Sequence, residues 1–213
     1  MDIVLFGASG MVGSCILREL AARGHRVTAV VRNPARVATA PGVTAVHGDL
    51  TDASRVASYL EGADAVISAY SPASGHERDL LQATEALLAA ARQAGLVRVI
   101  IVGGAASLFV APGLTLLDSG HLPEQWKDIA QAHSDLLALI RNSDVAVDLE
   151  WTYFSPAAFI QPGERTGKFR LGKDELVTDA QGQSRISAED YAIALVDELE
   201  KPQHVQQRFT IGY

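Results

Sequence analysis

Short apolar runs alternate, over the first hundred residues, with stretches in which apolar positions recur every three or four residues. The runs are rich in β-branched residues and have the length of strands, whereas the longer spacing is typical of helices with one buried face. This alternation predicts a parallel sheet covered by helices on both faces. The predicted strands are residues 2–6, 26–31, 43–47, 63–69 and 97–102, and the predicted helices are residues 11–23, 53–60 and 77–94, with at most a short helix at 34–38.

The alternation stops after residue 102. Residues 103–123 form a long apolar stretch interrupted by proline and glycine, and residues 156–172 form a second. Long loops in compact domains are usually functional, and such an apolar segment is not expected to be disordered, so both stretches are expected to build a substrate pocket. The remaining predicted elements are a helix at 124–142, a strand at 149–154, a helix that Ser187 and Asp190 begin with a capping box and that stops before Pro202, and a strand at 208–211.

These elements predict a single α/β domain over residues 1–213, a Rossmann-type doubly wound parallel sheet with small pocket-forming elements in its C-terminal half.

Composition indicates which cellular compartment and which classes of partner to expect. Cys15 is the only cysteine, so no internal disulfide is possible and a reducing cytoplasm is expected. We expect no signal peptide and no membrane partner, because no basic n-region precedes the first strand and no apolar run reaches about 18 residues. The 25 acidic residues against 18 basic ones argue against general nucleic-acid binding, and no pattern specifies an oligomeric state.

A glycine-rich loop follows the first predicted strand and opens the first predicted helix. Residues 7–13 read GASGMVG, a spaced variant of the dinucleotide-binding fingerprint in the position that its mechanism requires. Gly7 would permit the tight turn, Gly10 would let the backbone approach a pyrophosphate, and Gly13 would let the helix pack close to the sheet. An ordinary strand-to-helix turn is the alternative. The backbone N–H groups expected to face the phosphates are those of Ser9, Gly10, Met11 and Val12.

The end of the second predicted strand bears on the choice between NADP and NAD. An NAD site usually places a carboxylate there, on the ribose 2′-hydroxyl, whereas this chain has Arg32. Arg32 could make a forked contact with a 2′-phosphate, with a hydroxyl from Ser9, which favours NADP over NAD. The alternative is a solvated loop charge. Asp49 and Leu50 follow the third predicted strand and would contact the adenine, although Asp49 could instead form a turn before the next helix.

The chain resembles the atypical short-chain dehydrogenases/reductases, namely NmrA-like NAD(P)H-binding proteins of the NADH-flavin reductase and biliverdin reductase B type. The motifs that carry the resemblance are FGASGMVG at 6–13, VRNP at 31–34, GDL at 48–50, SPAA at 155–158, QPGERTG at 161–167 and SRISAEDYA at 184–192. The resemblance implies a sheet of order 3-2-1-4-5-6 with an added strand. It also implies that Ala69 and Tyr70 flank a ribose, that Gly103 lies beneath the nicotinamide ribose, and that Ser155, Pro156 and Ala157 close over the nicotinamide.

Most enzymes of the wider superfamily use a Tyr-xxx-Lys pair as acid and base, and this chain departs from that pattern. None of its five tyrosines has a lysine four residues on. Dehydrogenation of alcohols by that pair is therefore not expected, and no catalytic residue is assigned. The leading hypothesis is an NAD(P)H-dependent reductase of a planar aromatic acceptor, a flavin or quinone, with residues such as Phe109 and Phe159 as pocket walls. The alternative is a redox sensor that binds NADP(H) and reports it to a partner.

Other candidate groups have ordinary structural explanations. The six histidines form no metal-binding motif, so no metal site is predicted. His133 could be a catalytic acid, but a partly buried structural histidine is the favoured interpretation. Cys15 is expected to pack in the core. Arg165, Lys168 and Arg170 could meet a flavin phosphate, although a solvated basic edge is favoured.

Overall fold

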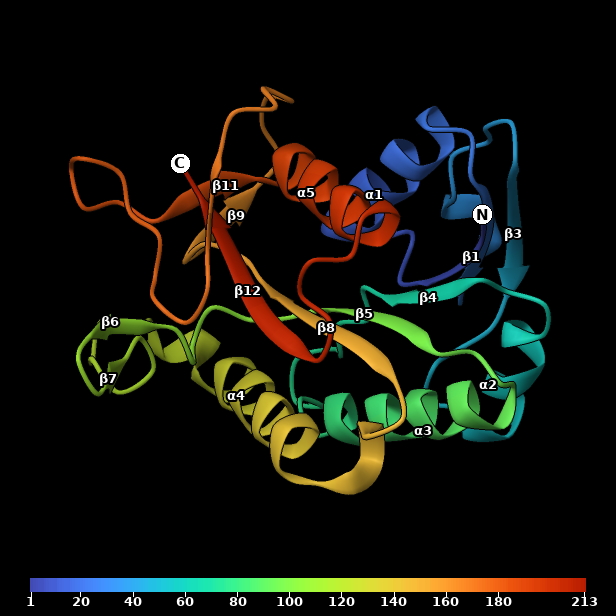
Figure 1. The fold of residues 1–213 in the computed structure, drawn as a ribbon, viewed down its shortest axis with the longest axis horizontal. Helices are drawn as coiled ribbons and strands as arrows, with labels where there is room; N and C mark the ends of the chain where they lie inside the picture. The colour runs from blue at the N-terminus through green and yellow to red at the C-terminus, as the bar shows by residue number, and fades with distance from the viewer.

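The computed structural model describes residues 1–213 as one central sheet between two layers of helices (Figure 1). Seven strands are parallel, and the short β10 pairs antiparallel with β12 at one edge. Across the sheet the strands are ordered β3 (Val43–His47), β2 (Arg26–Val31), β1 (Asp2–Phe6), β4 (Ala65–Ser68), β5 (Arg98–Val102), β8 (Glu150–Ser155), β12 (Gln207–Gly212) and β10 (Arg170–Gly172). The predicted order and doubly wound class are therefore confirmed, with β12 as the added strand and β10 beyond it.

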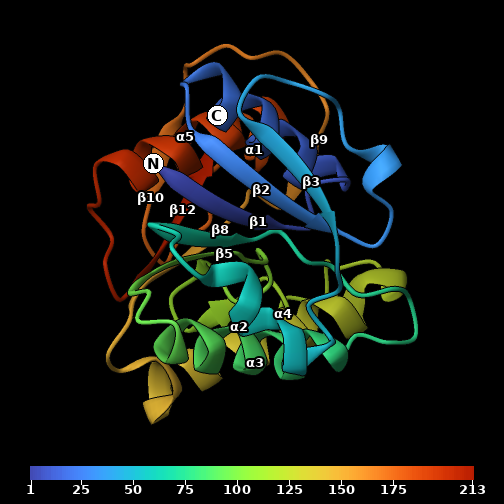
Figure 2. The same ribbon diagram turned by 90° about the vertical axis from the view of Figure 1, so that its right-hand side faces the viewer.

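The helices divide between the two faces of the sheet (Figures 1 and 2). One face carries α1 (Met11–Ala22) and α5 (Ala188–Glu200), which pack against each other. The other carries α2 (Ala53–Leu60), α3 (Asp79–Gln93) and α4 (Lys127–Asn142). The chain leaves β1 toward β2 on one side and later reaches β4 on the other, so the carboxyl ends of β1 and β4 flank the switch point where such sheets bind ligands.

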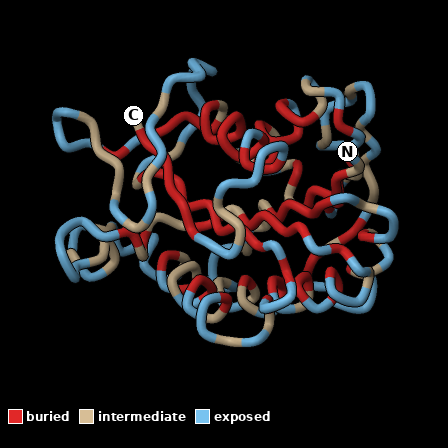
Figure 3. The backbone as a smooth tube through the Cα atoms, viewed as in Figure 1, coloured by how far each residue is buried: buried red, intermediate tan, exposed pale blue.

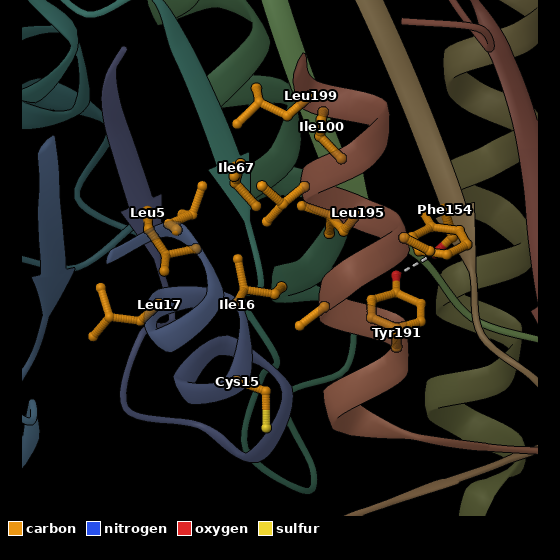
Figure 4. Packing of buried hydrophobic residues seen from close by; sticks show 14 of the residues in the cluster. Leu5, Cys15, Ile16, Leu17, Ile67, Ile100, Phe154, Tyr191, Leu195 and Leu199 are labelled. Atoms are coloured by element: carbon orange, nitrogen blue, oxygen red, sulfur yellow. Dashed lines mark hydrogen bonds between the residues drawn. The ribbon is translucent and has the colours of Figure 1, made fainter. Parts of the chain in front are cut away.

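Each face of the sheet has its own hydrophobic core, and the strands are buried apart from the edge strands β3 and β10 (Figure 3). On the α1–α5 face, Leu5 of β1 and Ile67 of β4 pack with Ile16 of α1 and Leu195 of α5 (Figure 4). Cys15 lies in the same cluster, as expected for a packing residue. This continuous burial explains why the parallel strands appear in the sequence as apolar runs without alternation.

The predicted capping box of α5 is only half correct. The Ser187 hydroxyl caps the helix by accepting from the Asp190 N–H at 3.0 Å. The Asp190 carboxylate does not return to the Ser187 N–H, which instead donates to the Tyr213 hydroxyl at 3.2 Å. Asp190 is fully buried and accepts from the N–H groups of Thr166 and Gly167, both at 2.8 Å, and from the Tyr213 hydroxyl at 2.9 Å. The residue therefore holds the segment 162–168 against α5.

Ser187→Ala is expected to destabilise the protein by about 2 kcal/mol, because the variant loses the α5 cap and also the hydrogen bond from Ser187 to the Glu164 carbonyl. Urea unfolding followed by circular dichroism measures this cost. Ser58→Ala is the matched control, since that exposed hydroxyl donates only to a carbonyl within α2, and it should stay within about 0.5 kcal/mol of wild type. Equal stabilities for the two variants would show that the cap does not stabilise α5.

The two stretches predicted to be irregular contain short strands. β6 (Phe109–Ala111) and β7 (Leu114–Thr115) form a hairpin, and β9 (Phe159–Gln161) pairs in parallel with β11 (Arg185–Ser187). Together with the outlying loops they gather at one end of the molecule, at the left of Figure 1. Strands of two or three residues carry too little periodicity to be recognised in a sequence.

The basic cluster after residue 163 is exposed to solvent, as expected, and two of its members also bind other segments of the chain. Arg165 makes two hydrogen bonds of 2.9 Å to the buried carboxylate of Glu19 on α1. Arg170 donates to the carbonyl oxygens of Thr178 and Tyr213. Both arginines therefore fasten the C-terminal segments to the rest of the fold.

No helix in the structure has the length and apolar character needed to cross a membrane.

Candidate functional site

The three glycines of the loop between β1 and α1 are each required for a different structural reason. Gly7 has a φ of +78°, and a Cβ there would lie 2.2 Å from the Ala69 carbonyl oxygen. A Cβ at Gly13 would lie 2.1 Å from the Gly7 carbonyl oxygen. This glycine therefore lets the helix approach the loop, whereas the sequence predicted an approach to the sheet. A Cβ at Gly10 would meet only the Gly7 oxygen, at 3.3 Å. Gly10 therefore leaves open space where the helix begins.

Of the four backbone N–H groups predicted to face the phosphates, one is not free. The Gly10 N–H donates to the Gly7 carbonyl at 3.0 Å and is therefore not available to a ligand. The N–H groups of Ser9, Met11 and Val12 make no backbone hydrogen bond, and no side chain caps the helix. Three of the four predicted donors are therefore unpaired at the positive end of a 12-residue helix, an arrangement that suits a phosphate.

A pocket of about 240 Å³ adjoins this loop at the carboxyl ends of β1, β2, β3 and β4. Of the residues predicted to bind cofactor, it is lined by Gly7, Ser9, Gly10, Arg32, Asp49, Leu50, Ala69 and Tyr70. The structure therefore brings together the glycine loop and the residues that follow three other strands. The residues outside its lining are Met11, Val12, Gly13, Gly103, Ser155, Pro156 and Ala157, and their cofactor contacts remain predictions.

Two arginines without partners lie in this pocket. Arg32, at the end of β2, and Arg36, in the 3₁₀ turn η1 (Pro34–Arg36), both line it, and neither side chain makes an ion pair or hydrogen bond within the chain. Arg36 was missed by the sequence analysis. The sequence feature that could have revealed Arg36 is the turn that Asn33 and Pro34 favour. Asn33 accepts from the Ala35 N–H at 3.1 Å and Pro34 begins η1, and this turn places Arg36 in the same pocket as Arg32.

Asp49 combines the two roles weighed from the sequence. One carboxylate oxygen accepts from the Thr51 N–H at 3.0 Å, which is a turn interaction, and the residue also lines the pocket beside the buried Leu50. Opposite them, partial burial and then the charge of Asp49 raise the pKa of Tyr70 above its ordinary value. Tyr70 therefore stays protonated at neutral pH and is a hydrogen-bond donor rather than a base.

Gly103 and Gly104 are explained by packing around Tyr153. A Cβ at Gly103 would lie 2.2 Å from the Tyr153 ring, and one at Gly104 would lie 2.8 Å from the His133 Cβ. The Tyr153 hydroxyl accepts from the Gly104 N–H at 3.1 Å and donates to the His133 carbonyl at 3.0 Å. Burial lowers the pKa of His133 to about 4, so its ring is neutral at pH 7. His133 is thus part of a structural cluster, as the favoured interpretation held.

Ser155 stands at the carboxyl end of β8 with its side chain fully buried. Its hydroxyl is the one buried side-chain oxygen of the chain without a hydrogen-bond partner. Pro156 and Ala157 follow and lead directly into the second segment predicted to build a pocket.

A second pocket, of about 530 Å³, opens just beyond the end of β8. It joins both predicted pocket segments and the loop before β11, and it is lined by Leu116, His121, Leu122, Pro123, Trp126, Ala158, Phe159, Gln161, Leu176, Gly182, Gln183, Ser184 and Arg185. Phe159 is a wall, as predicted, and its ring makes a T-shaped contact with the Trp126 ring, with 6.4 Å between the centroids. Phe109 is not a wall: it lies in the β6–β7 hairpin, where its N–H donates to the Asp174 carbonyl.

Comparison with known proteins decides the family. A model of an NAD(P)H-binding family matches residues 7–202, nearly the whole chain. The chain belongs to this NAD(P)H-binding family. The match begins at Gly7, the first glycine of the loop, and continues through α5, so it covers the second pocket and all of the first except Phe6.

Individual relatives agree with this assignment. The chain is 39% identical to the protein YwnB of Bacillus subtilis over 99% of its own length and 98% of that protein. A solved structure from Bacteroides thetaiotaomicron, named a "putative epimerase", is 43% identical with a TM-score of 0.92 over 100% of this chain and 96% of that one. Another, from Streptococcus pneumoniae and named a "putative NADH-flavin reductase", is 33% identical with a TM-score of 0.86 over 100% and 99%. The family is therefore one of NAD(P)H-binding, oxidoreductase-type proteins.

Proposed function

We propose that this member of the NAD(P)H-binding family is an NADPH-preferring reductase of a planar aromatic acceptor such as a flavin or quinone. The observation that carries the proposal is the pairing of two pockets at one edge of the sheet. One holds the glycine loop and two unpartnered arginines, and the other is lined by apolar and aromatic side chains. The first suits the adenosine half of a dinucleotide, and the second suits a flat apolar ring.

The residues of the first pocket fit the cofactor. The open space beside Gly10 and the free N–H groups of Ser9, Met11 and Val12 suit a pyrophosphate. Asp49 and Leu50 would face the adenine, and Arg32 with Arg36 would bind the 2′-phosphate that distinguishes NADP from NAD. In this fold the nicotinamide half of a dinucleotide lies across the switch point, toward β5 and β8. The second pocket begins in that direction, with Ala158 three residues beyond Ser155.

The acceptor class follows from the acids that the site lacks. A carbonyl that receives a hydride becomes an alkoxide and needs a placed acid, usually the tyrosine of a Tyr-xxx-Lys pair. This chain has no such pair, and Tyr153 is buried and bonded to His133 and Gly104. A flavin or quinone spreads the incoming charge over a conjugated ring. The bound cofactor would supply a hydride and solvent the remaining proton, so the protein's part is to orient two rings and exclude water.

This account predicts that no side chain near the two pockets is an essential acid. Tyr70→Phe, His133→Asn and Ser155→Ala should each retain flavin reduction with a kcat within about threefold of wild type, since general acid catalysis typically contributes about a hundredfold or more. Steady-state kinetics measures the effect, and thermal unfolding shows that each variant is folded. A loss of about a hundredfold in one folded variant with unchanged cofactor and flavin affinity would identify a catalytic acid and refute this mechanism.

A further inference from the structure

One carboxylate joins three elements of the fold beside the second pocket. Asp174, in the loop between β10 and β11, accepts through its Oδ1 from the Nε of Arg208 at 2.9 Å and from a terminal nitrogen of Arg141 at 3.0 Å. Arg208 lies on β12, and Arg141 lies near the end of α4. Asp174 is not part of the pocket lining, so its carboxylate acts on the protein rather than on a ligand.

The pairing of Asp174 with Arg208 is firmly determined, because that arginine is buried. The side chain of Arg208 is 1% exposed, and Asp174 is its one anionic partner. Burial alone would raise the pKa of Asp174, but hydrogen bonds from Arg208 and Arg141 hold it below its ordinary value, so the carboxylate is charged at neutral pH. Separating the two groups would leave a buried charge without compensation, and this fixes the place of Asp174.

The backbone around Asp174 continues this connection into the pocket wall. The Asp174 carbonyl accepts from the Phe109 N–H at 2.8 Å, and the Phe109 carbonyl accepts from the Leu176 N–H at 2.9 Å. The chain then returns, so that the Leu116 N–H donates to the carbonyl of the fully buried Leu108 at 2.8 Å. Leu116 and Leu176 both line the second pocket. Two apolar parts of the lining are thus carried by segments that meet at Asp174.

The β6–β7 hairpin contributes little to its own position. Its strands have three and two residues, and Phe109, Val110 and Leu114 are all exposed. A hairpin of two strands is at best marginally stable by itself, and this one buries little apolar surface. Its placement therefore depends on anchors outside it, namely the ion pairs of Asp174 and the backbone hydrogen bonds on either side of that residue.

We infer that Asp174 is a positioning residue for acceptor binding: clamped between Arg208 and Arg141, it places the segments that carry Leu116 and Leu176 and so fixes the shape of the second pocket. This inference rests on the proposed function and assigns a role to a residue outside the pocket. Loss of the clamp formed by Asp174, Arg208 and Arg141 should loosen the acceptor pocket and leave cofactor binding intact, because none of these three residues lines the first pocket.

The test measures the Michaelis constants for flavin mononucleotide and for NADPH separately. Asp174→Asn removes the charge at almost unchanged size. It should raise the KM for flavin mononucleotide about tenfold, while kcat and the KM for NADPH stay within about threefold of wild type. A merely structural role would lower the midpoint of thermal unfolding without separating the two Michaelis constants. Asp174→Glu keeps the charge and should recover part of the acceptor affinity.

Asp148→Asn is the matched control, since it removes the same charge from an exposed ion pair with Arg92, and it should leave both Michaelis constants at their wild-type values. If Asp174→Asn does not fold, because Arg208 is left buried without a counter-charge, the double variant Asp174→Asn/Arg208→Gln takes its place. The double variant removes both charges together, avoids that cost and should show the same raised KM for flavin mononucleotide.

Two results would overturn the positioning role of Asp174. These are an unchanged KM for flavin mononucleotide in a folded variant that lacks the clamp, and an equal rise in both Michaelis constants. In either case turnover by wild type would show that the proposed function stands. If wild type reduces neither a flavin nor a quinone, the proposed function and this inference both fail.

Discussion

Gly10→Val is expected to abolish binding of NADPH and NADH, by at least about a hundredfold in affinity, while the protein remains folded. A Cβ at this position meets only the Gly7 carbonyl oxygen, at 3.3 Å, so a shift of a few tenths of an ångström is enough to admit it. The new isopropyl group would occupy the space beside the free N–H groups of α1, where the pyrophosphate is expected. Isothermal titration with each cofactor measures the loss, and circular dichroism confirms the fold.

Gly13→Ala is the contrasting variant, because it is expected to lower the stability of the fold, whereas Gly10→Val is expected to lower cofactor affinity. A Cβ there would lie 2.1 Å from the Gly7 carbonyl oxygen, so the loop or the helix must shift. An alanine in an unobstructed helix would gain about 1 kcal/mol over glycine, whereas this variant should lose stability. Gly10→Val with wild-type cofactor affinity would remove the loop from the binding site, whatever the behaviour of Gly13→Ala.

Replacing both Arg32 and Arg36 by alanine is expected to weaken NADPH binding about a hundredfold and NADH binding less than threefold. Each charge-assisted contact with a 2′-phosphate contributes about 1.5–3 kcal/mol, and solvent exposure of both arginines places the expected loss at the low end, about tenfold for each. Raising the salt concentration should narrow the difference between the cofactors in wild type, because exposed ionic contacts are screened.

Arg55→Ala is the control for this pair. Arg55 lies on α2, where its guanidinium is 5.7 Å from the centre of the Tyr59 ring, and it does not line the pocket. Its removal should leave both affinities unchanged. Equal losses of NADPH and NADH affinity in the Arg32/Arg36 variant would mean that the two arginines do not distinguish the 2′-phosphate.

The main sheet could be predicted from the sequence because its strands, apart from the edge strands β3 and β10, are buried on both faces. Their apolar runs, separated by helical periodicity, indicate parallel strands, and the first five strands and three helices lie within a few residues of their predicted limits. The C-terminal half was harder. β6, β7, β9, β10 and β11 have two or three residues each, too few for a recognisable periodicity, and β9, β10 and β11 also pair with segments distant in the sequence.

The site shows the same division between local and long-range information. The glycine loop, Arg32 and Asp49 follow strands directly, and motif spacing was enough to bring them together. Arg36 was missed because its place depends on the η1 turn. The second role of Asp190, as an acceptor for Thr166 and Gly167, was missed because a capping motif describes only its own helix.

The central claim, that this member of the NAD(P)H-binding family is a reductase, is tested most directly by mixing the protein anaerobically with NADPH and excess flavin mononucleotide. Absorbance of the oxidised flavin and of NADPH is followed together. The account predicts that both fall in equal amounts, at a rate proportional to protein concentration and far above the rate without protein. Tight binding of NADPH without acceleration of its reaction with flavin mononucleotide, riboflavin or a quinone would contradict the claim and favour a cofactor sensor.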